Sequence, residues 1–239
     1  MRYTNKHFFY TDPAAYDERV RQPIESFIAN EWDPLLRQYL HDEIRAGMTV
    51  ADLGCGTFIH TQHMGAARHI YAVDINEKML AWGRPKIEHM ADKVTILCES
   101  ATHTSLPAAS CDVVWVDGLS EFLHLPDLFR EVQRIIKPGG KFIILYQNKW
   151  HPENLLVALY YWLLRRRGKK YRSLGEFKKT AARFNFNLLH FESRALFFYA
   201  PPFLQNRAIG LWRRLNRLYA PYQKKVPLGN NILCIFQKG

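Results

Sequence analysis

Cysteine, long apolar runs and, late in the chain, acidic side chains are the scarce features of this sequence. The 239 residues include four cysteines, none in a C-x-x-C spacing, namely Cys55, Cys98, Cys111 and Cys234. This pattern argues against a metal site or a disulfide framework and predicts buried, reduced thiols. No run reaches the roughly 18 apolar residues that cross a bilayer, and the start of the chain has no signal-peptide core. We therefore expect a cytoplasmic protein.

Acidic residues almost disappear after residue 140. Residues 1–140 hold 14 Lys and Arg against 19 Asp and Glu, whereas residues 141–239 hold 19 against 3. The two parts carry net charges of −5 and +16, which together give the formal charge of +11. Such segregation indicates an anionic partner on one face of the protein.

The most informative motif is the run V-A-D-L-G-C-G-T at residues 50–57, which predicts a buried strand followed by a glycine turn. Glycines there let the backbone approach a ligand more closely than a Cβ atom would allow. Asp74 ends the next predicted strand, 22 residues after Asp52, where a carboxylate can accept both hydroxyls of a ribose. No third glycine follows Gly54 and Gly56 in register, so the run differs from the G-x-G-x-x-G dinucleotide fingerprint.

Further segments follow in a fixed order over residues 48–146. Strands are predicted at 94–98 and 111–116, and the sequence K-P-G-G at 137–140 separates a helix end from a fifth strand that runs to Leu145. In this order the segments resemble the small-molecule branch of the class I S-adenosylmethionine-dependent methyltransferase family, whose first motif is an acid, an apolar residue and G-x-G. Asp52, Gly54 and Gly56 match that motif directly.

The resemblance implies an α/β, Rossmann-like fold, with a seven-stranded, mostly parallel sheet, helices on both faces and an antiparallel last strand. It implies S-adenosyl-L-methionine as cofactor, with S-adenosyl-L-homocysteine as product. The backbone of Gly54, Cys55 and Gly56 is expected to meet the amino-acid end of the cofactor, and Asp52 to bond it directly or through water. Asp117 and Gly118 follow strand four, where the methionyl and acceptor sites of the family meet.

The other end of the cofactor is expected near the ends of strands two and three. Asp74 would hold the ribose and Ile75 would pack against the adenine. Ser100 and Ala101 occupy the loop in which this family often has an acid for the adenine amino group, and Glu99 is the alternative candidate. The sequence also departs from the family at Phe58, where a glycine commonly stands.

Many such enzymes need no dedicated catalytic side chain, because the methyl donor is already activated and placement of the nucleophile is sufficient. For a general base the sequence offers only His124 and His151, since histidine titrates near neutral pH. No residue is expected to bind a metal.

The chain is expected to form one domain over residues 1–239. Residues 1–46 form an N-terminal helical cap with helices that start at Pro23 and Pro34, and residues 48–146 form the cofactor-binding core. Basic, aromatic and helical insertions occupy 149–175 and 198–229, after strands five and six. A helix near 177–184 and a strand at 188–197 lie between them, and 230–237 is the last strand.

The insertions suggest how the protein meets its partners. Residues 154–164 are apolar nearly all round a helix and run into a cluster of Arg and Lys, and the second insertion contains a basic amphipathic helix. Residues 155–172 and 204–225 fit an anionic membrane surface, an acidic partner protein, or a packed lid with a solvated basic face. Nucleic acid fits less well, because the aliphatic residues would serve no stacking role.

We therefore expect methyl transfer to a small, hydrophobic or lipid-like acceptor, reached at a membrane surface. The alternatives are an RNA methyltransferase and a catalytically inactive cofactor-binding scaffold or regulatory subunit. No motif identifies the acceptor or the atom that is methylated.

Overall fold

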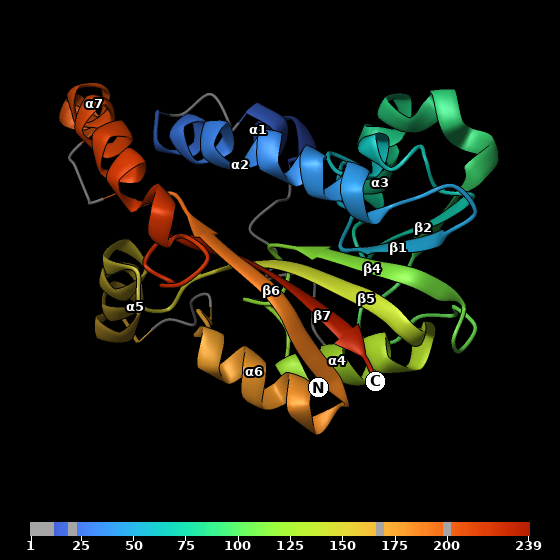
Figure 1. The fold of residues 1–239 in the computed structure, drawn as a ribbon. Helices are drawn as coiled ribbons and strands as arrows, with labels where there is room; N and C mark the ends of the chain where they lie inside the picture. Colours follow the sequence, from blue (N-terminus) through green and yellow to red (C-terminus); the bar gives the residue numbers. More distant parts are fainter. Residues whose placement is uncertain (1–11, 19–22, 166–169, 198–201) are drawn as a thin grey trace.

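A seven-stranded sheet with the order β3-β2-β1-β4-β5-β7-β6 organises the protein (Figure 1). The structure is a computed structural model that describes residues 12–18, 23–165, 170–197 and 202–239. β7 is antiparallel to β5 and β6, and the other neighbouring strands are parallel, so the predicted fold is confirmed. The strands are β1 Thr49–Leu53, β2 His69–Asp74, β3 Val94–Cys98, β4 Cys111–Asp117, β5 Ile136–Gln147, β6 Phe186–Arg194 and β7 Asn231–Lys238.

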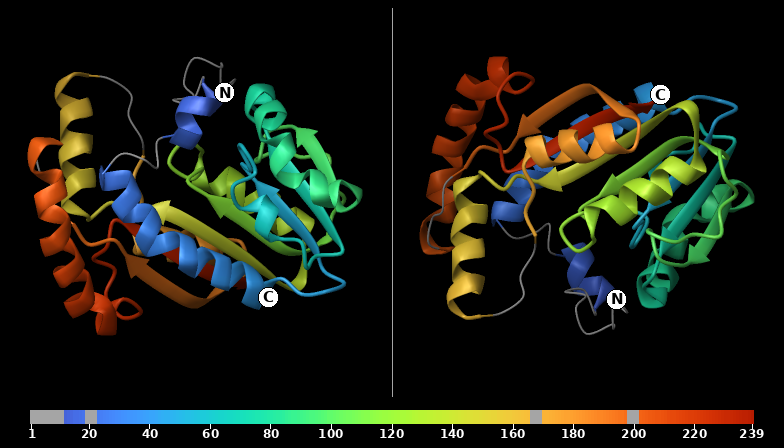
Figure 2. Two further views of the ribbon diagram at one scale, coloured as in Figure 1. Left: turned by 90° about the horizontal axis from the view of Figure 1, so that it is seen from above. Right: turned by 90° about the horizontal axis from the view of Figure 1, so that it is seen from below.

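Helices cover both faces of the sheet (Figure 2). One face carries α2 (Pro23–Glu43), η3 (Thr61–His63), α3 (Glu77–Gly83), η4 (Arg84–Lys93) and α7 (Pro202–Tyr219). The other face carries α4 (Leu125–Ile135) and α6 (Leu174–Arg183). Successive strand side chains point to opposite faces, so β1 supplies Val50 to one core and Ala51 and Leu53 to the other. All five β1 residues are buried, as expected for a central parallel strand covered on both faces.

The N-terminal cap consists of α1 (Pro13–Glu18) and α2. Pro23 begins α2 as predicted, but the prediction that a second helix starts at Pro34 was wrong, because Pro34 lies inside α2. The helix continues through the proline because its buried stripe is continuous, with Trp32 before Pro34 and Leu36 and Leu40 after it. The free energy gained by burying this stripe outweighs the loss of the one backbone hydrogen bond that proline cannot donate.

Two sequence predictions at strand ends also needed correction. Strand β6 was predicted at 188–197 but occupies Phe186–Arg194, because Asn185 and Ala195 adopt left-handed conformations with φ of 57° and 59° and bracket it. The cysteines are all free thiols, and three are buried as predicted. Cys98, at the end of β3, is exposed, because no helix covers this last residue of an edge strand.

The two insertions form helices that lie side by side at one end of the sheet, α5 (Pro152–Leu163) and α7 (Figures 1 and 2). Helix α7 is anchored through Trp212, which packs against Phe27 at 5.4 Å and Phe197 at 5.6 Å between ring centroids. Asn216 adds two hydrogen bonds to the backbone of Leu196, at 2.6 and 2.9 Å. In α5, by contrast, Asn154 is the one buried residue. Within the described residues, no helix combines the length and apolar composition needed to cross a bilayer.

The difference between the two helices gives a stability prediction. Trp212 is 1% exposed and Trp162 in α5 is 73% exposed. We expect Trp212→Ala to lower the free energy of unfolding by about 3–5 kcal/mol, because it removes a fully buried aromatic side chain. Trp162→Ala should change it by less than about 0.5 kcal/mol. Urea unfolding of both variants checks this, and equal effects would mean that α5 packs as tightly as α7.

Candidate functional site

The site begins with the glycine turn after β1. The peptide N–H groups of Gly54 and Cys55 donate to the carbonyl of Val73 at 2.7 and 3.1 Å, which holds the turn against the end of β2. Gly54 and Gly56 have φ of +81° and +53°, in the left-handed region that favours glycine. A Cβ atom on Gly54 would also lie 2.9 Å from the side chain of Leu119. The left-handed φ and the close contact with Leu119 together favour glycine at this position.

Phe58 occupies a turn position at which the family commonly has a glycine. It adopts a left-handed conformation with φ of 61°, which disfavours residues with a side chain by roughly 1–2 kcal/mol. Its ring is fully buried, so burial of aromatic surface offsets this strain. The departure from the family pattern at this position thus preserves the turn.

Asp74 lies beside the turn, as its position at the end of β2 predicts. One carboxylate oxygen accepts a hydrogen bond from Gly56 N at 2.9 Å and the other from Asn76 N at 2.8 Å. Burial raises the pKa of this carboxyl above its ordinary value, and these backbone hydrogen bonds oppose the shift. Each oxygen has a further lone pair, so the carboxylate can accept hydroxyl groups while it holds the turn.

The loop after β3 lies next to the end of β2. Ile75 is partly exposed and Ala101 is buried, while Ser100 shares a 3.0 Å hydrogen bond between its hydroxyl and that of Thr102. The carboxylate of Glu99 accepts a 2.7 Å hydrogen bond from Ser105 N and so stabilises this loop. The roles predicted for these residues toward adenine stay predictions.

Asp117 and Gly118 mark the end of β4. Along this strand Trp115 and Asp117 point to the face covered by α2, and Asp52 points to the same face because it pairs with Trp115 across β1 and β4. Gly118 has φ of +59°, and its N–H donates to Leu145 O at 3.1 Å. The pairing of these strands therefore brings Asp52 and Asp117 to one edge.

A histidine that sequence reasoning missed stands between them. His60 Nε2 lies 2.7 Å from Asp117 Oδ2, and its ring centroid lies 5.5 Å from that of Trp115. Burial opposes charging of the ring, but Asp117, Asp52 and Asp33 outweigh it, so the pKa of His60 is raised. The signal available in the sequence was a histidine four residues after Gly56, but only the fold shows which carboxylates surround it.

Asp52 is almost completely buried in this cluster. Its Oδ2 accepts a 2.6 Å hydrogen bond from the hydroxyl of Thr61. Burial raises the pKa of Asp52 to about 6, while Thr61 and His60 favour its ionised form. Among the described residues, no group of three or more His, Cys, Asp or Glu is arranged to hold a metal ion.

The two histidines predicted as general bases have other surroundings. His124 precedes α4, is 62% exposed, and pairs with Asp127 at 3.1 Å. His151 precedes α5, is fully buried, and packs against Phe197 with ring centroids 4.7 Å apart. Burial lowers the pKa of His151 to about 4. Its imidazole is therefore neutral near pH 7 and part of the core that joins α5 to the sheet.

The N-terminal cap is attached to the same edge through Asp17 of α1. Its carboxylate accepts hydrogen bonds from Thr57 at 2.7 Å, Lys86 at 2.7 Å and Trp82 at 3.0 Å. Burial opposes ionisation of Asp17, but these partners outweigh it and lower its pKa. Because Thr57 directly follows the glycine turn, α1 and the turn are held together.

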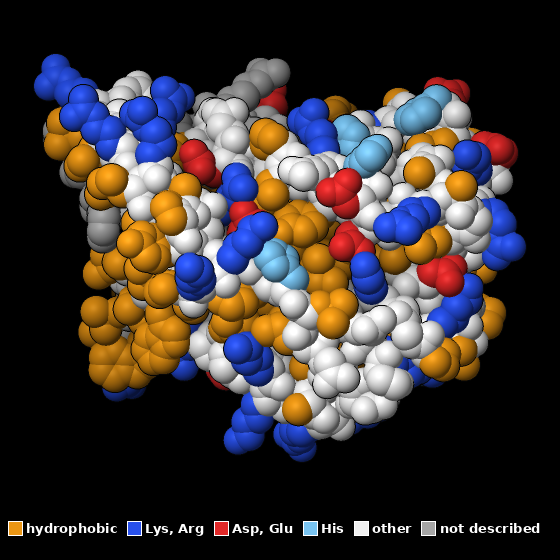
Figure 3. Space-filling view, in the orientation of Figure 1, with side chains coloured by type: hydrophobic (Ala, Val, Ile, Leu, Met, Phe, Trp, Pro, Cys, Tyr) orange, Lys and Arg blue, Asp and Glu red, His pale blue; other side chains and the backbone are white. Residues whose placement is uncertain are grey.

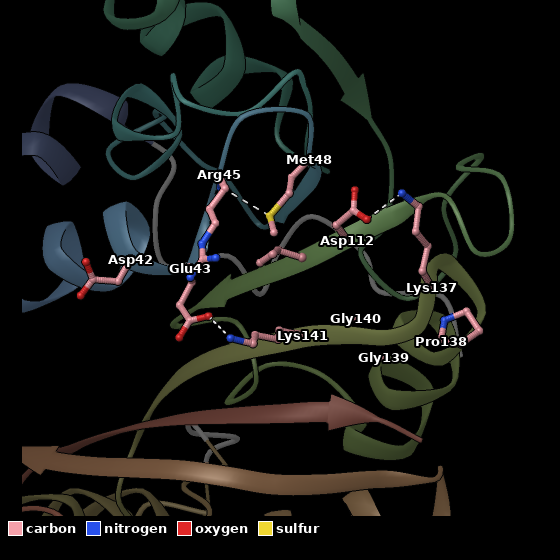
Figure 4. Close-up of a pocket in the computed structure, with 11 residues that line it drawn as sticks. Asp42, Glu43, Arg45, Met48, Asp112, Lys137, Pro138, Gly139, Gly140 and Lys141 are labelled. Carbon is pink, nitrogen blue, oxygen red and sulfur yellow. Dashed lines mark hydrogen bonds and ion pairs between the residues drawn. The ribbon is translucent and has the colours of Figure 1, made fainter.

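A separate hollow lies at the opposite edge of the sheet (Figure 4). Lys137 pairs with Asp112 at 2.7 Å across it, and Lys141 pairs with Glu43. These residues surround the starts of β4 and β5. Ligands of open α/β sheets bind at the carboxyl ends of the strands, so we assign no function to this hollow.

Comparisons with known proteins relate this chain to methyltransferases. Residues 51–144 match the family model described as a methyltransferase domain. The ubiquinone/menaquinone biosynthesis C-methyltransferase UbiE of Ralstonia pickettii (strain 12J) is 34% identical over 116 residues, which are 46% of this chain and 47% of that protein. A demethylmenaquinone methyltransferase of Lactobacillus johnsonii is 26% identical over 172 residues, 66% of this chain and 69% of that protein. The chain spans about half the length of the UbiE proteins that it matches.

Solved structures show the same fold. Geranyl diphosphate C-methyltransferase from Streptomyces coelicolor A3(2), in complex with Mg²⁺, geranyl-S-thiolodiphosphate and S-adenosyl-L-homocysteine, superposes with a TM-score of 0.61 at 17% identity, covering 86% of this chain and 76% of that one. An S-adenosylmethionine-dependent methyltransferase from Mesorhizobium loti gives a TM-score of 0.61 at 22% identity, covering 86% and 96%.

The buried state of His151 predicts an acid-sensitive contribution to stability. Its folded pKa of about 4 lies below the ordinary value of 6.5, so stability is lost as pH falls below about 6.5. Between pH 7.5 and pH 5 we expect His151 to account for a loss of about 2 kcal/mol in the free energy of unfolding. Urea unfolding of wild type and His151→Gln at both pH values isolates this loss as the change in their difference. A pH-independent difference would contradict the assignment.

Proposed function

We propose that this chain, a member of the class I S-adenosylmethionine-dependent methyltransferase family, transfers the methyl group of S-adenosyl-L-methionine to a small hydrophobic acceptor. The observation that carries the proposal is the arrangement at the carboxyl edge, where Asp74 is bonded to the glycine turn at Gly56 and Asp117 ends the neighbouring strand β4. Curated relatives named as quinone-biosynthesis methyltransferases support a small apolar acceptor.

The residues at this edge fit the cofactor. Within the described part of the chain, Gly118 has no other atom within 4 Å of the position of a Cβ atom, so a ligand can lie against bare backbone there. Asp74 would accept the ribose hydroxyls, and Asp52 and Asp117 would face the cationic end of the amino-acid portion. When bound, the cofactor supplies a sulfonium whose methyl group is already activated for transfer.

The protein's own contribution is then placement and exclusion of water. The cap holds α1 against the turn through Asp17, and α2 covers the face to which Asp52 and Asp117 point. Carboxylates in a site shielded from water favour a cation there more strongly than they would in solvent.

The cofactor assignment is testable without knowledge of the acceptor. Calorimetric titration of wild type with S-adenosyl-L-methionine and S-adenosyl-L-homocysteine should give saturable binding. Asp74→Ala should weaken both by about 10- to 100-fold, because hydrogen bonds to an ionised carboxylate are lost. Asp92→Ala, at an exposed carboxylate in η4, is the matched control and should bind as wild type does. Absence of binding by folded wild type would favour a scaffold without cofactor.

We further propose that the acceptor is reached at an anionic membrane surface through α5 and α7. Six large apolar side chains of α5 are exposed, namely Leu155, Leu156, Leu159, Tyr160, Trp162 and Leu163. In Figure 3 apolar side chains gather over α5, and Lys and Arg side chains gather over the neighbouring α7. This surface is larger than the isolated apolar residues usual on monomers, and such patches typically mark interaction sites.

Charge favours a membrane as the partner. The exposed basic residues Arg207, Arg213, Arg214 and Arg217 lie on α7, and Arg165 follows α5. Each basic residue near an anionic lipid surface contributes about 1 kcal/mol to binding, and exposed Trp and Tyr are typical of the interfacial region. The carboxyl ends of β5 and β6 precede these helices, so a lipid-like acceptor would enter from the same edge as the site. Residues 166–169, within the predicted 155–172 segment, lie outside the described residues.

Sedimentation with vesicles tests the membrane proposal. At low salt, wild type should pellet with vesicles of mixed phosphatidylcholine and phosphatidylglycerol and remain in solution with phosphatidylcholine alone. Arg213→Gln/Arg214→Gln should weaken binding by about 30-fold. Trp162→Ser/Leu163→Ser should abolish it, whereas Leu189→Ser, an exposed leucine of β6, should not. Failure of wild type to bind would leave an acidic partner protein, and co-purified RNA with a salt-sensitive affinity would favour RNA methylation.

A further inference from the structure

The hydrogen bond between His60 and Asp117 orients the imidazole so that its other ring nitrogen can accept a proton. A carboxylate can only accept a hydrogen bond, so His60 Nε2 donates to Asp117 Oδ2 over 2.7 Å. This bond fixes the tautomer in which Nδ1 carries the lone pair. Among the described residues Nδ1 has no hydrogen-bond partner, and 19% of the side chain is exposed.

The ring is also held in place and surrounded by negative charge. Trp115 packs against it with a centroid distance of 5.5 Å and an interplanar angle of 55°. The charged and titratable groups that act on this cluster come from four elements: Asp52 of β1, Asp117 of β4, Asp33 and Arg37 of α2, and His63 of η3. Three carboxylates against one exposed guanidinium and one exposed imidazole favour a cation at His60.

We propose that His60, oriented by Asp117, is the general base that takes the proton from the acceptor during methyl transfer. The inference rests on the proposed function and goes beyond it, because the transfer can proceed by placement alone. The acceptor X–H gives an electron pair to the methyl carbon, the C–S electron pair stays on sulfur, and the proton passes to His60 Nδ1. One positive charge thus moves from sulfonium to imidazolium, and the nearby carboxylates stabilise it in both positions.

The placement predicts how His60 responds to the two forms of the cofactor. A sulfonium close to His60 repels the imidazolium, whereas the neutral thioether of the product does not. The pKa of His60 should therefore be lower in the complex with S-adenosyl-L-methionine than in that with S-adenosyl-L-homocysteine by about one pH unit or more. His124, exposed and paired with Asp127, serves as the internal control.

Nitrogen-15 NMR titration of the histidine rings in both complexes measures this difference. His60→Gln and His60→Asn identify the resonance independently, and Asp117→Asn should lower the pKa in both complexes. Equal pKa values for His60 in the two complexes would overturn the proposal, because the base would then lie too far from the transferred methyl group. If neither ligand binds, the proposed function fails instead.

Calorimetry separates proton transfer from cofactor binding. We expect His60→Asn to bind S-adenosyl-L-methionine within about threefold of wild type, since a base acts on the acceptor. A loss as large as that of Asp74→Ala would assign His60 to holding the cofactor and overturn its role as a base.

Discussion

The position of β1 between β2 and β4 is the constraint on which the site depends. Pairing of Leu53 with Val73 on one side and Val116 on the other aligns the ends of three parallel strands. The residues that follow are the glycine turn, Asp74 and Asp117. Each is placed by backbone pairing in the buried middle of the sheet, where register is strongly specified. A one-residue shift in the register of β1 would turn Asp52 away from α2, and the same shift of β4 would turn Asp117 away from it.

Charge is distributed so that the two functions proposed for the protein do not interfere. The carboxylates of Asp52 and Asp117 lie beneath α2, which carries Asp33, and the arginines lie on α7 and after α5, at the end of the sheet beyond β5 and β6. The first group favours a cation at the carboxyl edge of the sheet, and the second favours an anionic surface. The exposed arginines act over a short range, because salt screens exposed charges within about 10 Å at ordinary ionic strength.

Much of the fold could be predicted because its signals are local. Buried strands are apolar runs bounded by turn residues, so residues 94–98 were predicted with the observed bounds. Pro34 misled because its preference for helix starts is weaker than burial of the stripe around it. The end of β6 was missed because an alanine in a left-handed conformation leaves no sequence signal. His60 was missed for a related reason, since its partners on β1, β4 and α2 are brought together only by tertiary structure.

The exposed apolar face of α5 also governs how the protein behaves in concentrated solution. An uncovered patch of this kind drives molecules to associate with one another, and the net charge of +11 opposes this by mutual repulsion. Added salt weakens that repulsion and leaves the apolar attraction intact. Salt that detaches the protein from an anionic surface would therefore also promote its self-association. Low salt thus favours both colloidal stability and surface binding.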